Sequence, residues 1–85
     1  MHRTTERFWN CFKKLPTSIK NLAKENFKLL ILNPRQPSLH FKKVGKFWSA
    51  RVGLTYRALA IKDGHDFIWV WIGTHDEYEQ MIEEN

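Results

Sequence analysis

The sequence offers little from which a covalent or metal-bound framework could be built. Cys11 is the only cysteine among 85 residues, so no intramolecular disulfide can form, and no Cys-x-x-Cys pair provides a zinc site. The histidines include no His-Glu-x-x-His motif or other ligand spacing. We therefore expect a domain without metal or cofactor, held together by its hydrophobic core and suited to the reducing cytoplasm.

Long hydrophobic runs are also missing. The first ten residues contain no apolar stretch of signal-peptide length, and no segment approaches the roughly 20 apolar residues that cross a bilayer. Residues 1–85 suffice for one small domain, whose few core side chains leave little room for a deep cofactor cavity. We expect a soluble, single-domain protein with no membrane partner.

Acidic residues are scarce in most of the chain. Up to Lys62 there are 14 basic and two acidic residues, Glu6 and Glu25, whereas the remainder has seven acidic residues and no basic one. Such a cationic field attracts polyanions, RNA or DNA foremost, and it equally suits an acidic protein partner. Composition alone leaves both kinds of partner open.

Two helical patterns come first along the chain. Apolar residues recur at spacings of three and four over residues 4–15, which indicates one buried helical stripe. Pro16 interrupts this pattern, and Thr17 or Ser18 is the expected N-cap of a second helix that ends near Asn33, just before a proline. The short connection predicts a two-helix antiparallel hairpin.

The pattern changes to strands after Gly45. Alternating or β-branched runs over residues 47–52, 55–61 and 67–72, separated by glycine-containing turns, predict a three-stranded antiparallel sheet. Thr74 is the expected cap of a short C-terminal helix. Together these elements predict an α+β fold in which the helical hairpin covers one face of the sheet.

The last predicted strand is apolar on both faces. Strict alternation puts Phe67, Trp69 and Trp71 on one face and the three aliphatic residues between and after them on the other. A strand of this composition is covered on both sides. We therefore expect it to lie inside the sheet.

Alternation also brings two arginines to one face of the sheet. Arg51 shares a face with Ser49 in the first strand, and we expect Arg57 to project from the same face of the second. Two adjacent guanidiniums repel each other, so an anion between them would explain the pair; alternatively, each contacts only water. Three lysines precede this strand and extend the positive region: Lys42, Lys43 and Lys46.

His75 follows the last strand directly. A histidine at a strand end can act as a general acid or base near neutral pH, with Asp76 to orient its ring. Tyr78, one helical turn later, could stack on a base or hydrogen-bond a phosphate. The structural alternative is a surface imidazole, a helix-start carboxylate and a packing tyrosine.

The order of several short motifs resembles the RelE/ParE superfamily of type II toxin-antitoxin toxins, in particular its RelE-like cytotoxic translational repressors. The segments that carry the resemblance are residues 12–16 (FKKLP), 32–34 (LNP), 37–44 (PSLHFKKV), 48–53 (WSARVG), 56–59 (YRAL) and 71–78 (WIGTHDEY). They extend over nearly the whole chain.

This resemblance implies a RelE-like microbial RNase fold whose exposed sheet face binds messenger RNA, often on the ribosome, and which a small acidic antitoxin protein inhibits. It also implies metal-free endoribonuclease chemistry, in which the ribose 2′-hydroxyl attacks the adjacent phosphate. By position, the resemblance implies that Arg57 holds the scissile phosphate, that Arg51 is a second basic contact, that His75 assists proton transfer and that Tyr78 lies near a terminal tyrosine involved in activity. The lysines named above complete the predicted RNA-binding surface.

Two departures from the family pattern lead to further expectations. Only three residues precede Thr4, so we expect the N-terminal strand of many relatives to be missing. Ser49 stands where several ribosome-dependent members have a lysine. Because a DNA-gyrase-poisoning relative shares the fold without the catalytic residues, the alternative is a non-catalytic, ParE-like module that poisons a target or binds a partner.

Overall fold

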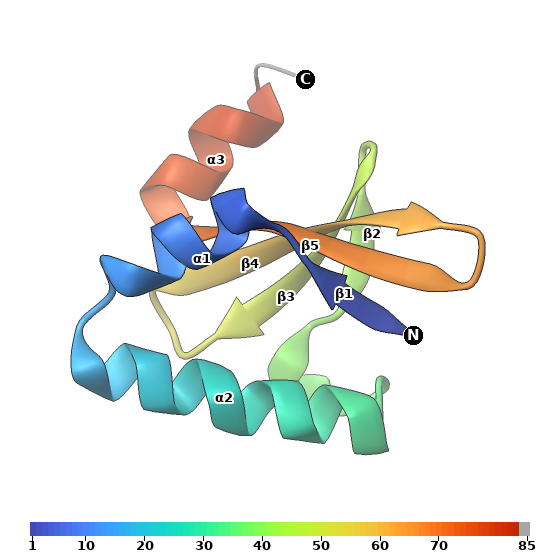
Figure 1. Cartoon of the computed structure of the whole chain (residues 1–85), viewed down its shortest axis with the longest axis horizontal. Coiled ribbons are helices and arrows are strands. Elements are labelled where there is room, and N and C mark those ends of the chain that lie inside the picture. The colour runs from blue at the N-terminus through green and yellow to red at the C-terminus, as the bar shows by residue number, and fades with distance from the viewer. Residues whose placement is uncertain (84–85) are drawn as a thin grey trace.

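A computed structural model describes residues 1–83, which form three α-helices and a five-stranded sheet (Figure 1). The elements in chain order are β1 (His2–Thr4), α1 (Glu6–Lys13), α2 (Thr17–Leu32), the 3-10 turn η1 (Pro37–Leu39), β2 (Lys42–Val44), β3 (Phe47–Val52), β4 (Tyr56–Asp63), β5 (Asp66–Thr74) and α3 (His75–Glu83). The strands lie in the order β1-β5-β4-β3-β2. The long strands β3, β4 and β5 are the predicted antiparallel meander, with β5 inside the sheet.

The prediction of a three-stranded sheet was incomplete, because two edge strands of three residues each make the sheet five-stranded and mixed. β1 pairs parallel with β5, and β2 pairs antiparallel with β3. The expected absence of an N-terminal strand was therefore wrong. A strand of three residues is too short to display the alternation by which strands are recognised in a sequence.

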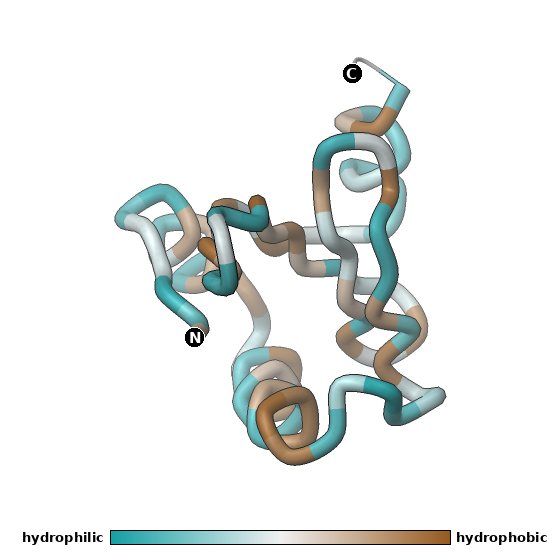
Figure 2. The backbone as a smooth tube through the Cα atoms, turned by 90° about the vertical axis from the view of Figure 1, so that its right-hand side faces the viewer, coloured by the Kyte–Doolittle hydropathy of each residue, from teal (hydrophilic) through white to brown (hydrophobic). Residues whose placement is uncertain are grey.

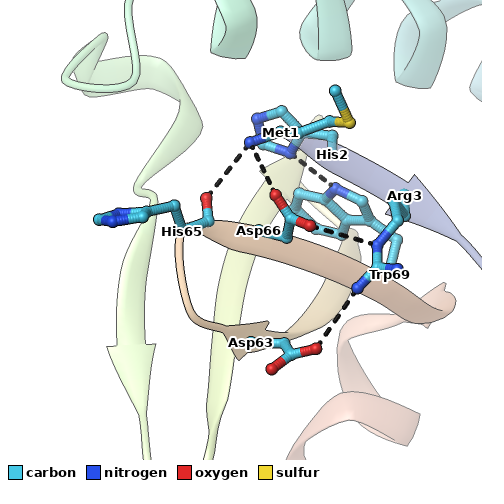
Figure 3. A network of polar contacts seen from close by, with 7 residues as sticks. All are labelled: Met1, His2, Arg3, Asp63, His65, Asp66 and Trp69. Atoms are coloured by element: carbon cyan, nitrogen blue, oxygen red, sulfur yellow. Dashed lines mark hydrogen bonds and ion pairs between the residues drawn. The ribbon is translucent and has the colours of Figure 1, made fainter.

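Side-chain contacts hold β1 against the sheet (Figure 3). The indole N–H of Trp69 donates to Nδ1 of His2 over 3.0 Å, and the Arg3 guanidinium lies 3.4 and 3.5 Å from carboxylate oxygens of Asp63 and Asp66. These partners come from β4 and β5, at the other end of the chain. Tertiary contacts therefore define this strand.

Helices α1 and α2 lie on the same side of the sheet and run in roughly opposite directions (Figure 1). Thr5 caps α1, since its hydroxyl oxygen accepts a hydrogen bond from the Phe8 N–H over 3.1 Å. The expected cap at Thr17 or Ser18 was wrong: α2 begins at Thr17 itself, after Pro16, with no side-chain cap. Figure 2 looks along α2 and shows hydrophobic residues around its last turn.

Two clusters of buried side chains lie on opposite faces of the central strands. The cluster under α1 and α2 includes Ala50, Val52 and Ala58, as strand alternation predicts. The second cluster joins Tyr78 of α3 to residues on the other face, namely Phe47, Leu59 and Trp71. The sheet is thus a middle layer, with α3 covering part of the face that carries the predicted site.

The predicted faces of β5 are correct only up to Trp69. A bulge opposite Leu59 and Ala60 makes Trp69 pair with Ala60 and Trp71 pair with Leu59. The additional residue moves Trp71 to the α3 face, while Ile72 joins Trp69 under α1 and α2. The placement of Trp71 beside Phe67 and Trp69 was therefore wrong.

Candidate functional site

Arg51 and Arg57 stand directly opposite each other in the β3–β4 ladder. Residues paired in this way project from the same face of a sheet, which confirms the predicted shared face. Both side chains are half-buried. Phe47 and Leu59 point to the same face, since each is an even number of residues from the arginine in its strand, and they pack with Tyr78, so α3 covers this face in part. The fold therefore holds the two arginines side by side on one face of the sheet.

No carboxylate compensates these two charges. Among residues 1–83, Arg3 is the only lysine or arginine whose side chain forms an ion pair, and residues 26–62 contain no acidic residue. Burial, and next the charge of Arg51, lower the pKa of Arg57, while Tyr78 acts in the opposite direction. The Nε atom of Arg51 is buried without a hydrogen-bond partner. This environment favours an anion as a ligand.

The Arg57 guanidinium is directed toward α3. Its Nη1 donates to the Tyr56 carbonyl oxygen over 2.9 Å, and its Cζ lies 5.9 Å from the centre of the Tyr78 ring. The Tyr78 ring is also 5.7 Å from the imidazole of His75, so both basic groups lie near it. Tyr78 is only 8% exposed and is part of the second cluster. Its ring also supports the Arg57 guanidinium.

Local hydrogen bonds position His75. The Thr74 hydroxyl oxygen accepts from the Glu77 N–H, and the Glu77 carboxylate accepts from the Thr74 N–H and hydroxyl, so the expected cap of α3 is a capping box. These bonds from Thr74 lower the pKa of Glu77. The His75 N–H donates to the Thr55 carbonyl oxygen over 2.7 Å. The start of α3 is thereby fixed against the β3–β4 turn.

These elements enclose an open depression of about 500 Å³. It is lined by the two arginines, the β3–β4 turn and the start of α3: Arg51, Leu54, Thr55, Tyr56, Arg57, Thr74, His75 and Asp76. Three of the four predicted catalytic residues thus share one surface, and the fourth, Tyr78, lies beside it. The carboxylate nearest the imidazole is Glu79, with its Oε1 3.5 Å from Nδ1 of His75, and not the expected Asp76.

The three predicted lysines do not all join this surface. Lys42 pairs with Ser49 and shares its face with the arginines, whereas Lys43 pairs with Trp48 and projects from the opposite face. Lys46 lies in the β2–β3 turn with its ammonium 5.4 Å from the centre of the Phe47 ring. Of these two strand lysines, Lys42 therefore lies on the face of the site and Lys43 lies outside it.

One neighbour of the site was not predicted from the sequence. Nε2 of His40, an exposed residue after η1, lies 3.4 Å from Nη1 of Arg51. Nothing in the local pattern distinguishes His40, since it lies in a loop between two short elements. Its position depends on how η1 packs against β3.

No group of three or more His, Cys, Asp or Glu side chains within residues 1–83 lies close enough to hold a metal ion. None of the helices there is long and apolar enough to span a bilayer.

Neither a protein-family model nor a curated protein sequence matches the chain. Solved structures do. The RelB-RelE antitoxin-toxin complex from Methanococcus jannaschii has a chain that matches with a TM-score of 0.66 at 18% identity, covering 93% of this chain and 96% of that one. The toxin-antitoxin complex RelBE2 from Mycobacterium tuberculosis matches with a TM-score of 0.66 at 24% identity, covering 88% and 96%.

A third match is a copper-bound mutant toxin from Helicobacter pylori, with a TM-score of 0.59 at 16% identity and coverage of 89% and 94%. The matches extend over nearly the full length of each chain. This protein therefore has the fold of RelE-type toxins, as the motifs predicted.

Proposed function

We propose that this chain, which has the RelE toxin fold, is the toxin of a type II toxin-antitoxin system and cleaves messenger RNA without a metal ion. The observation that carries the proposal is the Arg51–Arg57 pair, which faces the same depression as His75 and, within residues 1–83, has no carboxylate counter-ion. Two opposed like charges destabilise a sheet. A bound phosphodiester removes that repulsion.

The reaction that suits these groups is transfer of the phosphoryl group to a ribose hydroxyl. The 2′-oxygen attacks the adjacent phosphorus as its proton leaves, the bond from phosphorus to the 5′-oxygen breaks, and that oxygen takes up a proton. The products are a 2′,3′-cyclic phosphate and a 5′-hydroxyl end. Arg57 and Arg51 stabilise the charge on the phosphoryl oxygens, and His75 transfers a proton.

The proposed protein partner is a small acidic antitoxin. The RelE neighbours come from toxin-antitoxin complexes. This chain is cationic up to Lys62 and has an apolar patch at the end of α2, where Leu29, Ile31 and Leu32 are exposed. Such a combination fits a protein that supplies both carboxylates and apolar side chains.

A second candidate function is a non-catalytic module that binds and poisons a target. Ser49 favours it, because this residue stands where several ribosome-dependent members of the family that the motifs resemble have a lysine, and it is only 3% exposed. Tyr78 favours it as well, since burial in the second cluster limits its contact with substrate. The two functions predict different effects on cellular RNA.

The test is a brief pulse of expression in bacteria, followed by mapping of transcript 5′ ends. We expect growth arrest and new 5′-hydroxyl ends with the wild type, and neither with Arg57→Ala or His75→Ala. His65→Ala is the matched control, because it removes an exposed imidazole in the β4–β5 turn, where Figure 3 shows the ring pointing away from neighbouring polar groups. Arrest with intact messages in every variant would refute the ribonuclease and favour the binding module.

A further inference from the structure

His40 has a backbone conformation that side chains rarely adopt. Its φ of 45° and ψ of 41° lie in the left-handed region, and it is the only non-glycine residue with positive φ among those described. Glycine reaches this region without a steric penalty, whereas a residue with a Cβ atom is strained there. His40 is the C-cap of η1, where a left-handed residue commonly ends a helix and is usually glycine; a histidine there keeps a side chain that glycine would lack.

The contact that the side chain makes is with Arg51. Arg51 Nη1 and His40 Nε2 are 3.4 Å apart, and a neutral imidazole accepts this hydrogen bond. Arg57, although directly opposite Arg51, is directed to Tyr56 and Tyr78 instead. The two guanidiniums therefore have partners on different sides of the β3–β4 pair. His40 comes just before β2, which lies beside β3 at one edge of the sheet, whereas Tyr78 belongs to α3, which contacts β4 and β5.

The surroundings of His40 contain no acidic group within its own part of the chain. The next charged residues along the sequence are Arg35 and Lys42, and no carboxylate occurs between Glu25 and Asp63. The elements nearest to it, η1, β2 and β3, therefore contribute only cationic or neutral side chains. An anion is the ligand that such a position favours.

We propose that His40 and Arg51 form a second phosphate-binding position, adjacent to the one formed by Arg57 and His75, so that an RNA strand is held through two successive phosphates. This inference rests on the proposed RNA-binding function. A phosphate beside Arg51 takes the place of the imidazole as acceptor, and His40 then donates to the phosphate oxygen. Arg51 lines the same depression as Arg57 and His75, so it contacts the cleaved phosphate on one side and the next phosphate, beside His40, on the other.

The decisive variant is His40→Gly, because it removes the imidazole and relieves the backbone strain at once. We expect its melting temperature to equal or exceed that of the wild type, so that weaker binding cannot be due to unfolding. The probe is a fluorescein-labelled, 2′-O-methylated RNA hexamer, which lacks the attacking hydroxyl and stays intact. Its affinity is measured by fluorescence anisotropy at pH 6.0 over a range of salt concentrations.

We expect His40→Gly to weaken binding about three- to tenfold. At pH 6.0 its plot of log affinity against log salt should be shallower than that of the wild type by up to about 0.7, the value for one phosphate contact on a single strand. His65→Ala, the matched loss of an imidazole elsewhere, should match the wild type in both respects.

The outcomes separate this inference from the function on which it rests. If the wild type binds the hexamer and cleaves RNA while His40→Gly binds it equally well, the second phosphate position is refuted and the ribonuclease stands. A loss of affinity with an unchanged salt slope also refutes it, because the imidazole would then make no contact with a phosphate. If the wild type does not bind the hexamer, the proposed function and this inference fall together.

Discussion

Replacing Arg51 with methionine should make the fold more stable while weakening RNA binding. Arg51 and Arg57 are direct cross-strand partners, and a pair of like charges in this arrangement costs about 0.2–1 kcal/mol. Methionine keeps an apolar stem of similar length, yet it removes both the charge and the buried Nε atom that has no hydrogen-bond partner. We therefore expect Arg51→Met to raise the free energy of unfolding by about 0.5–1 kcal/mol at low salt.

The assay is urea unfolding, followed by tryptophan fluorescence, in about 0.01 M and about 1 M salt. The Debye length falls from about 30 Å to about 3 Å between these conditions, so a gain due to relief of repulsion should shrink at high salt. Arg57→Met and the double variant complete a cycle. Since the repulsion can be removed only once, the gains of the two single variants should together exceed the gain of the double variant.

Three results would refute this reasoning. The first is a loss of stability in Arg51→Met at low salt, which would mean that its contact with His40 outweighs the repulsion from Arg57. The second is a gain that does not change with salt, which would point to packing instead of charge. The third is simple additivity in the cycle, because the two guanidiniums would then not interact. In the matched control, Lys20→Met, the charge removed is on α2, outside the site.

Two further predictions concern stability. Burial, and next the positive charge of the N-terminus, lower the pKa of His2. The stability that its neutral ring contributes to the fold is therefore complete above pH 6.5 and is lost as the pH falls below that value. Urea midpoints measured from pH 8 to pH 5 should fall less in His2→Phe than in the wild type, and equal slopes would contradict this. Gly53 has a φ of 65°, and a Cβ atom there would lie 2.9 Å from Cδ2 of Leu22. Gly53→Ala should therefore lower the free energy of unfolding by about 1–2 kcal/mol. An unchanged urea midpoint would contradict this and show that the turn relaxes.

The parts of this structure that the sequence predicted are those with a repeating pattern. Alternation over β3 and β4 was enough to place Arg51 and Arg57 on one face, because a regular strand repeats every two residues. Alternation failed for Trp71, since the bulge in β5 inserts one residue and nothing in an aromatic, β-branched run marks where it falls.

The remaining features depend on long-range contacts. β1 exists because His2 meets Trp69 and Arg3 meets two carboxylates at the far end of the chain. His40 reaches the site only because η1 packs on β3, so local sequence could not link it to Arg51. Local patterns were enough to predict the central strands and the helices, whereas both edge strands and the position of His40 depend on tertiary packing.

Three unfavourable features lie together on this surface, and each could be removed by a single substitution. The opposed arginines repel each other, the Nε atom of Arg51 is buried without a partner, and His40 holds a backbone conformation suited to glycine. They arise from different physical causes, namely charge, desolvation and steric strain, so no single packing requirement explains all three. A phosphate at Arg51 would address the first two directly and give the His40 side chain a partner. For this reason the surface is better explained by selection for binding an anion than by selection for stability.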